Sequence, residues 1–109
     1  MIQLDQTQLK LVKGILSTYV PDRRVVAFGS RVQGTARLYS DLDLVILGDE
    51  PLEPHTLSEL RNDLAESDLS IQVDVLEWYS LLPSFRRAIE QTPIAIVQEA
   101  GSPMPEPAR

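Results

Sequence analysis

The sequence contains no cysteine, which excludes disulfide bonds, thiolate zinc sites and cysteine nucleophiles. It has no apolar run near the roughly 20 residues that a membrane-spanning helix needs. Its first ten residues, MIQLDQTQLK, do not follow the charged-then-apolar pattern of a secretory signal. These absences agree with a reducing compartment, and we expect a cytoplasmic protein with no membrane partner.

Basic side chains are scarce relative to acidic ones, and the net charge is -6. Residues 1–40 carry six Lys or Arg and two acids, whereas residues 41–109 carry four Arg and fourteen acids. Nonspecific nucleic-acid binding needs a basic face that displaces counterions from phosphates. We therefore expect no direct nucleic-acid partner, and we consider a basic protein or bound cations a better match.

Helical and strand patterns alternate along the chain, which favours an α/β (α+β) layer architecture. With 109 residues the chain is long enough for one core, so we predict one domain over 1–100 and a disordered, proline-rich tail over 101–109. The patterns predict the following elements: helices at about 6–19, 57–66 and 84–91, and strands over 24–28, 42–47, 70–76 and 93–97.

Two capping patterns mark where helices begin. Asp5 is followed three residues later by Gln8, and Thr56 is followed in the same way by Glu59. Between the first two strands, the segment SRVQGTA predicts a short helical turn. Among the remaining side chains, we expect Trp78 and Tyr79 to cover the core, with partner contact as the alternative. We expect His55 to lie at the surface or at a helix entry, and we expect a solvated position for Arg86 and Arg87.

Three acids lie within runs that otherwise resemble buried strands. Because side chains alternate along a strand, Asp41 and Asp43 point to one face about 7 Å apart. Asp74 has the same setting on the third predicted strand, opposite Val73 and Val75. If the two strands are neighbours, three carboxylates converge and repel one another unless a cation compensates. Carboxylates are hard oxygen ligands that suit Mg²⁺, so we predict a magnesium site. Taken alone, Asp41 would equally fit an exposed strand end.

A candidate phosphate-binding segment precedes the acid pair. Gly29 and Ser30 end the first strand, where glycine permits close approach of the backbone and free N–H groups point toward an anion. Arg31 and Arg37 follow, and each suits either phosphate or partner binding or an ordinary surface position. Ser40 suits either a hydrogen bond that orients the next carboxylate or a plain turn.

These residues together resemble a known family. Gly29-Ser30, then ten residues, then Asp41-x-Asp43, with Asp74 later, is similar to the active-site signature of the nucleotidyltransferase superfamily that includes DNA polymerase beta. The fuller motif GSRVQGTARLYSDLDLVI most resembles the minimal nucleotidyltransferases (MNT), which are commonly the antitoxins of HEPN/MNT toxin–antitoxin modules. The motifs cover residues 24–77 and imply a single-domain nucleotidyltransferase fold, a mixed β-sheet flanked by helices.

The resemblance implies roles for the site residues. Gly29 and Ser30 would contact the β and γ phosphates of a nucleoside triphosphate, and Arg31 and Ser40 are further candidates for nucleotide binding. The same three acids would be the catalytic residues and the ligands of two Mg²⁺ ions: Asp41, Asp43 and Asp74. The last of these would complete the second metal site and help to deprotonate the attacking hydroxyl.

The resemblance also implies an activity, that of a type VII antitoxin. Such a protein uses ATP to adenylylate a tyrosine of its cognate HEPN ribonuclease toxin and releases pyrophosphate. Two alternatives stay open: a nucleotide-sensing module that neutralises the toxin by binding alone, and a nucleotidyltransferase that acts on a small molecule. The three intact acids favour an enzyme, because a pure binding module gains nothing from clustered negative charge.

Overall fold

The computed structural model of the chain describes residues 2–36 and 40–101. Arg37 and most of the predicted tail therefore lie outside the described residues. The first residue of that tail, Gly101, is described, and its N–H donates a hydrogen bond of 3.2 Å to the carbonyl of Pro21. No helix in the described part of the chain is long and apolar enough to cross a membrane.

The predicted alternation of helices and strands is confirmed. The elements follow in this order: α1 (Gln6–Tyr19), β1 (Val25–Phe28), α2 (Ser30–Gln33), β2 (Leu42–Ile46), α3 (Pro54–Glu66), β3 (Val73–Glu77), the 3₁₀ turn η1 (Trp78–Ser80), α4 (Pro83–Glu90) and β4 (Ala95–Gln98).

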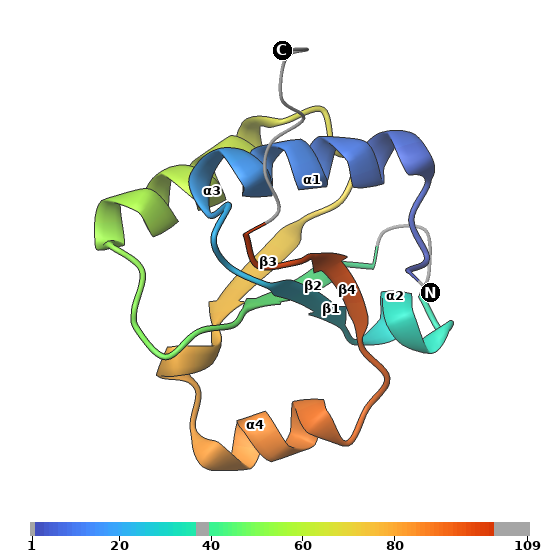
Figure 1. The fold of residues 1–109 in the computed structure, drawn as a ribbon. Coiled ribbons are helices and arrows are strands. Elements are labelled where there is room, and N and C mark those ends of the chain that lie inside the picture. The colour runs from blue at the N-terminus through green and yellow to red at the C-terminus, as the bar shows by residue number, and fades with distance from the viewer. Residues whose placement is uncertain (1, 37–39, 102–109) are drawn as a thin grey trace.

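The strands form one mixed sheet in the order β3-β2-β1-β4. β1 is antiparallel to both of its neighbours, whereas β2 and β3 are parallel. A parallel pair needs a long crossover, and α3 supplies it. Helices α1 and α3 lie over one face of the sheet and α4 lies below the other, while α2 lies beside the end of β1 (Figure 1).

The main core lies between the sheet and the α1–α3 layer. Its buried residues come from α1, α3 and all four strands: Val12, Leu16, Val25, Ala27, Leu42, Leu44, Ile46, Leu60, Leu64, Val75 and Val97. Alternation then directs the other side chains of β2 and β3, including Asp43 and Asp74, toward the α4 side. The hydrophobic pattern thus fixes which face carries the acids.

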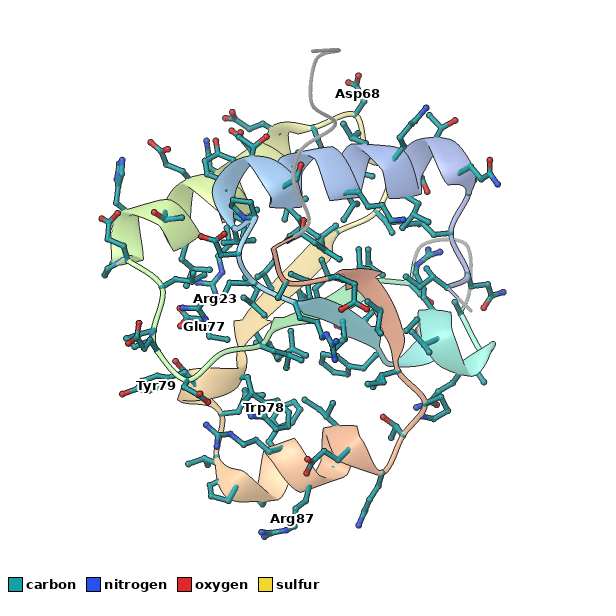
Figure 2. All side chains as sticks on the ribbon, in the orientation of Figure 1. Arg23, Asp68, Glu77, Trp78, Tyr79 and Arg87 are labelled. Atoms are coloured by element: carbon teal, nitrogen blue, oxygen red, sulfur yellow. The ribbon has the colours of Figure 1, made fainter. Side chains whose placement is uncertain are left out.

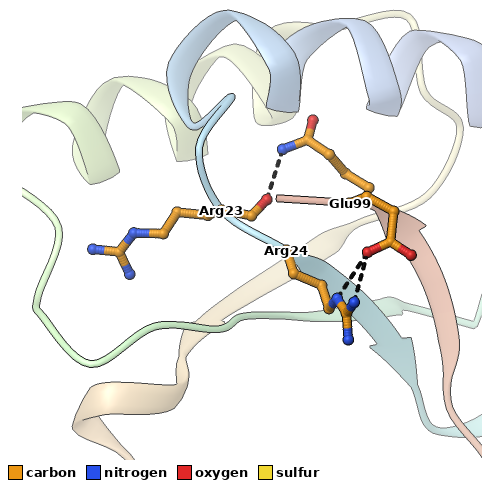
Figure 3. Close-up of polar contacts among 4 residues, drawn as sticks. Arg23, Arg24 and Glu99 are labelled. Atoms are coloured by element: carbon orange, nitrogen blue, oxygen red, sulfur yellow. Dashed lines mark hydrogen bonds and ion pairs between the residues drawn. The ribbon is translucent and has the colours of Figure 1, made fainter. Parts of the chain in front are cut away.

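Polar contacts join β4 to the start of β1. Arg24 forms an ion pair of 2.8 Å with Glu99, and the buried Gln98 donates its side-chain amide to the carbonyl of Arg23 at 2.9 Å (Figure 3). The same amide donates to the carbonyl of Val20 at 2.8 Å. A buried amide is tolerated where it is hydrogen-bonded. These contacts fix the last strand against the centre of the sheet.

Some boundaries differ from the prediction. α3 begins at Pro54 rather than at residue 57, because proline suits the first turn of a helix, where no N–H bond is needed. Thr56 is therefore not a cap, and its hydroxyl donates instead to the carboxylate of Glu53 at 3.1 Å. At the start of α1 the prediction holds, since the N–H of Gln8 donates to Asp5 at 2.8 Å.

Two side chains around η1 also differ from expectation. Arg86 is half-buried, and its Nε donates to the carbonyl of Trp78 at 3.0 Å. Its guanidinium carbon lies over the Trp78 ring, 5.3 Å from the ring centroid. Its expected solvated position is therefore wrong, because main-chain acceptors of η1 hold it. Tyr79 is 49% exposed and does not cover the core. Trp78 lies between the sheet and α4, and Arg87 points away from the molecule (Figure 2).

The contact between α1 and α3 gives a testable pH effect. The hydrogen bond from the Tyr19 hydroxyl to Asp63 raises the pKa of that phenol to about 12 from its ordinary value of 10.0. Because the folded pKa is the higher one, this stabilisation is present below pH 10 and is lost as the pH rises through about 12. Spectrophotometric titration should show one late phenol that disappears in Tyr19→Phe and titrates earlier in Asp63→Asn.

Candidate functional site

A row of three side chains crosses the sheet on the α4 side. Phe28 of β1 is paired with Asp43 of β2, and Asp43 is paired with Asp74 of β3. Residues in register on neighbouring strands lie on the same face. The two aspartates predicted from the alternation of the strands are therefore immediate neighbours.

Gly29 lies directly against the carboxylate of Asp43. A Cβ atom at this position would lie 2.5 Å from Asp43 Oδ2, so any side chain here would force the carboxylate to move. Its backbone has φ 83° and ψ -159°, a region that is essentially restricted to glycine. Close approach and backbone angle both require glycine here.

The segment after Gly29 turns into the short helix α2, as predicted. The carbonyl of Gly29 accepts hydrogen bonds of 3.0 Å from the N–H groups of both Val32 and Gln33. The N–H of Ser30, at the first position of the helix, has no acceptor among the described residues. The end of β1 therefore presents a main-chain donor beside the acidic row.

Arg31 is buried, at 7% exposure, and its guanidinium contacts main-chain oxygens. Nε donates to the carbonyl of Ser40 at 2.9 Å, and Nη1 donates to the carbonyl of Gln3 at 2.7 Å. The N–H of Gln3 in turn donates to the carbonyl of Arg31 at 2.6 Å. Arg31 thus connects α2, the N-terminal segment and the residue that precedes Asp41.

Asp43 experiences the electrostatic cost of this arrangement. Partial burial raises the pKa of its carboxyl above the ordinary value, and the negative charges of Asp74 and Asp41 raise it further. Gln72 donates its amide to Asp74 Oδ1 at 2.8 Å, which fixes the orientation of that carboxylate. The paired acids therefore concentrate negative charge on a partly desolvated surface.

Asp41 precedes β2 and is exposed. Among residues 2–36 and 40–101, no three acidic or histidine side chains stand close enough together to hold a metal ion. The structure thus brings Asp43 and Asp74 together but does not close the three acids into a cage, as expected for like charges that repel. The donor chemistry still fits Mg²⁺, because the ligands are carboxylate oxygens and a cation would relieve the crowding that raises the pKa of Asp43.

A pocket of about 720 Å³ opens beside the acidic row and extends around β3. Asp43 and Asp74 line it on the α4 side together with Phe28 and Phe85, whose rings meet edge to face at 6.5 Å between centroids. Neither phenylalanine was predicted to belong to the site. The position of Phe28 directly before Gly29 is a signal that could have placed it near the site. Nothing in the local sequence of α4 indicates that Phe85 lies near the acids.

The chain is similar to proteins of a known family. The model of the nucleotidyltransferase domain matches residues 9–96. The chain is 41% identical over 98 residues to the probable protein adenylyltransferase MntA of Haemophilus influenzae, covering 90% of this chain and 86% of that protein.

Solved structures with a similar fold include two toxin–antitoxin complexes. One, a toxin–antitoxin with AMP-PNP, has a chain that is 24% identical with a TM-score of 0.67, covering 82% of this chain and 71% of that one. The other contains a tri-AMPylated HEPN toxin of Shewanella oneidensis with an MNT antitoxin; its matching chain is 22% identical with a TM-score of 0.64, covering 86% and 71%. At these identities the likeness shows a shared fold.

The contact between Gly29 and Asp43 can be tested by substitution. We expect Gly29→Ala to lower the free energy of unfolding by about 1–3 kcal/mol, because alanine is strained at this backbone angle. It should also displace the Asp43 carboxylate, seen as a changed Asp43 resonance in NMR. Gly34→Ala is the matched control: Gly34 has φ 80°, but nothing lies within 4 Å of its Cβ position. An unchanged Asp43 resonance in Gly29→Ala would contradict the contact.

The charge on Asp43 should destabilise the metal-free fold. Since its pKa is raised on folding, its favourable contribution is present below the ordinary pKa of 3.8 and is lost as the pH rises through the folded pKa. In a chelating buffer at neutral pH, Asp43→Asn should therefore melt at a higher temperature than the wild type. The difference should vanish below pH 3.8, and the exposed control Asp68→Asn should not reproduce it.

Proposed function

The chain belongs to the nucleotidyltransferase domain family, and on this premise we propose that it is the antitoxin of a HEPN/MNT pair. It transfers AMP from ATP to a tyrosine of its HEPN toxin and releases pyrophosphate. The observation that carries this proposal is the in-register pair Asp43 and Asp74 beside Gly29, in a chain 41% identical to a protein adenylyltransferase. The HEPN toxin that is AMPylated in a complex of similar fold supports the same acceptor.

Nucleotidyltransferases use a nucleotide and a divalent metal, and we assign the metal ligands to Asp41, Asp43 and Asp74. Bound there, two Mg²⁺ ions would lower the pKa of the attacking hydroxyl and neutralise charge on the departing pyrophosphate. Because the pKa of Asp43 is raised, protons compete with a cation for this carboxylate over a wider range of acidic pH. Cation uptake should therefore weaken as the pH falls.

The main chain at the end of β1 is assigned to the phosphates. Gly29 has no side chain to block a phosphate beside Asp43, and the N–H of Ser30 has no acceptor among the described residues. We assign Arg31 a positioning role, because its guanidinium holds the main chain of Ser40 next to Asp41.

The transfer itself is a substitution at phosphorus. The tyrosine oxygen attacks the α-phosphorus of ATP, the new P–O bond forms as the bond to the bridging oxygen breaks, and pyrophosphate leaves. Asp74 lies in register with Asp43 and is assigned to accept the hydroxyl proton. Gln72 donates to Asp74 Oδ1 and so fixes the orientation of this carboxylate.

The decisive experiment incubates the protein with labelled ATP, Mg²⁺ and the product of the neighbouring gene. We expect label on that protein, and we expect the double variant Asp41→Asn, Asp43→Asn to lower labelling to below about one hundredth, since the charge-stabilising groups are lost. The fold should survive, because removing these charges relieves repulsion. The matched control removes two exposed acids elsewhere, Asp22→Asn with Asp68→Asn.

Other outcomes identify the alternatives. Neutralisation of the toxin without label would mean that binding alone suffices. Label that appears only on added small molecules would favour a small-molecule nucleotidyltransferase. Full labelling by the double aspartate variant would contradict the metal assignment.

A further inference from the structure

β3 forms one edge of the sheet (Figure 1). The N–H of Leu42 donates to the carbonyl of Gln72 at 2.9 Å, so the even-numbered residues of this strand face β2. Since alternate residues face the same way, Val73 and Val75 direct their N–H and carbonyl groups away from the sheet. Arg61 confirms this direction, because it donates to the outer carbonyl of Val75 at 2.7 Å.

Three further outer groups of this edge belong to residues that line the pocket. The N–H groups of Val73 and Val75 and the carbonyl of Val73 have no partner in the described ranges 2–36 and 40–101. Such a row of alternating donors and acceptors is the complement of an extended peptide segment. Arg61 ends the row at Val75, so a short segment fits it.

The edge is continuous with the proposed reaction centre. The row Phe28, Asp43 and Asp74 runs across three strands toward this edge. If an extended segment paired with β3, one of its residues would lie beside Asp74 at the usual strand spacing of about 4.8 Å. The side chain of that residue would lie on the same face as Asp74 and would continue the row. In an antiparallel pairing that position is a non-hydrogen-bonded one, where facing side chains are closest.

The pocket runs along both faces of the same strand. Its lining includes Asp74 and Phe85 on the α4 side and Leu64, Ala65 and Ile71 on the α3 side. An extended segment that directs one side chain toward Asp74 must direct the residues before and after it toward the α3 side. This geometry matches a tyrosine flanked by apolar residues.

From these observations we propose that the acceptor tyrosine lies in an extended segment that pairs with the outer edge of β3 and so extends the sheet by one strand. This inference rests on the proposed function and specifies how that acceptor is bound. A second copy of this chain fits the edge poorly, because a symmetric pairing centred on this part of β3 would place Asp74 near its own equivalent, and facing like charges are destabilising.

Amide hydrogen exchange measured by NMR tests the pairing. With the neighbouring-gene HEPN toxin and a nonhydrolysable ATP analogue, the amides of Val73 and Val75 should change from fast to slow exchange. The amides of Asp74 and Leu76, which face β2, should be slow in both states. Unprotected Val73 and Val75 amides in the complex would overturn the proposal. Protection in the protein alone that grows with its concentration would assign the edge to a second copy and would also overturn it.

A variant tests the same contact through the reaction. Val73→Pro removes an outward N–H and leaves the ladder to β2 intact, as edge strands allow. We expect labelling of the toxin to fall about tenfold or more, since a buried carbonyl of the acceptor loses its donor. Val73→Ala, which keeps the N–H, is the matched control and should change labelling less than about threefold. Both variants should bind ATP as the wild type does, which verifies their folding.

The outcomes separate the two proposals. If the wild type places no label on the toxin, the proposed function fails and this inference fails with it. If the wild type labels the toxin while Val73→Pro labels it equally well, only the edge-pairing proposal fails.

Discussion

The contact between the bare backbone of Gly29 and the carboxylate of Asp43 is the constraint on which the rest of the site depends. The antiparallel register of β1 and β2 places Phe28 opposite Asp43, so the residue after Phe28 must pass the carboxylate closely. A positive φ at Gly29 then turns the chain into α2. One close approach therefore sets both where the acid lies and where the main-chain donors of the next segment begin.

The surroundings of Asp43 lower the stability of the metal-free fold and favour the binding of a cation. Burial and two like charges raise the pKa of Asp43, so the folded protein is less stable when that carboxylate is ionised. A bound divalent cation would reverse the sign of this interaction. Strain and crowded charge at functional sites are compensated elsewhere in the fold. Here the buried apolar residues between the sheet and the α1–α3 layer provide that compensation.

Local patterns predicted the parts of the structure that local interactions decide. The cap at Asp5 marked the start of α1, and alternation placed Val75 in the core and Asp74 on the opposite face. The start of α3 was predicted too late, because Pro54 suits the first turn of a helix and begins it there. β3 begins at Val73 rather than at residue 70, since the residues before it, although apolar in part, have no strand partner.

Contacts between distant segments were not predictable in this way. The order of the strands, the approach of Phe85 to Phe28 and the contacts of Arg86 depend on pairing across the fold. Arg31 is a further example, and its contacts have an evolutionary consequence. Two of its hydrogen bonds end on main-chain oxygens, at Gln3 and Ser40. A substitution at Gln3 or Ser40 keeps the main-chain carbonyl that accepts the bond, whereas a replacement of Arg31 removes both bonds at once. These contacts therefore tolerate mutation at Gln3 and Ser40 but not at Arg31.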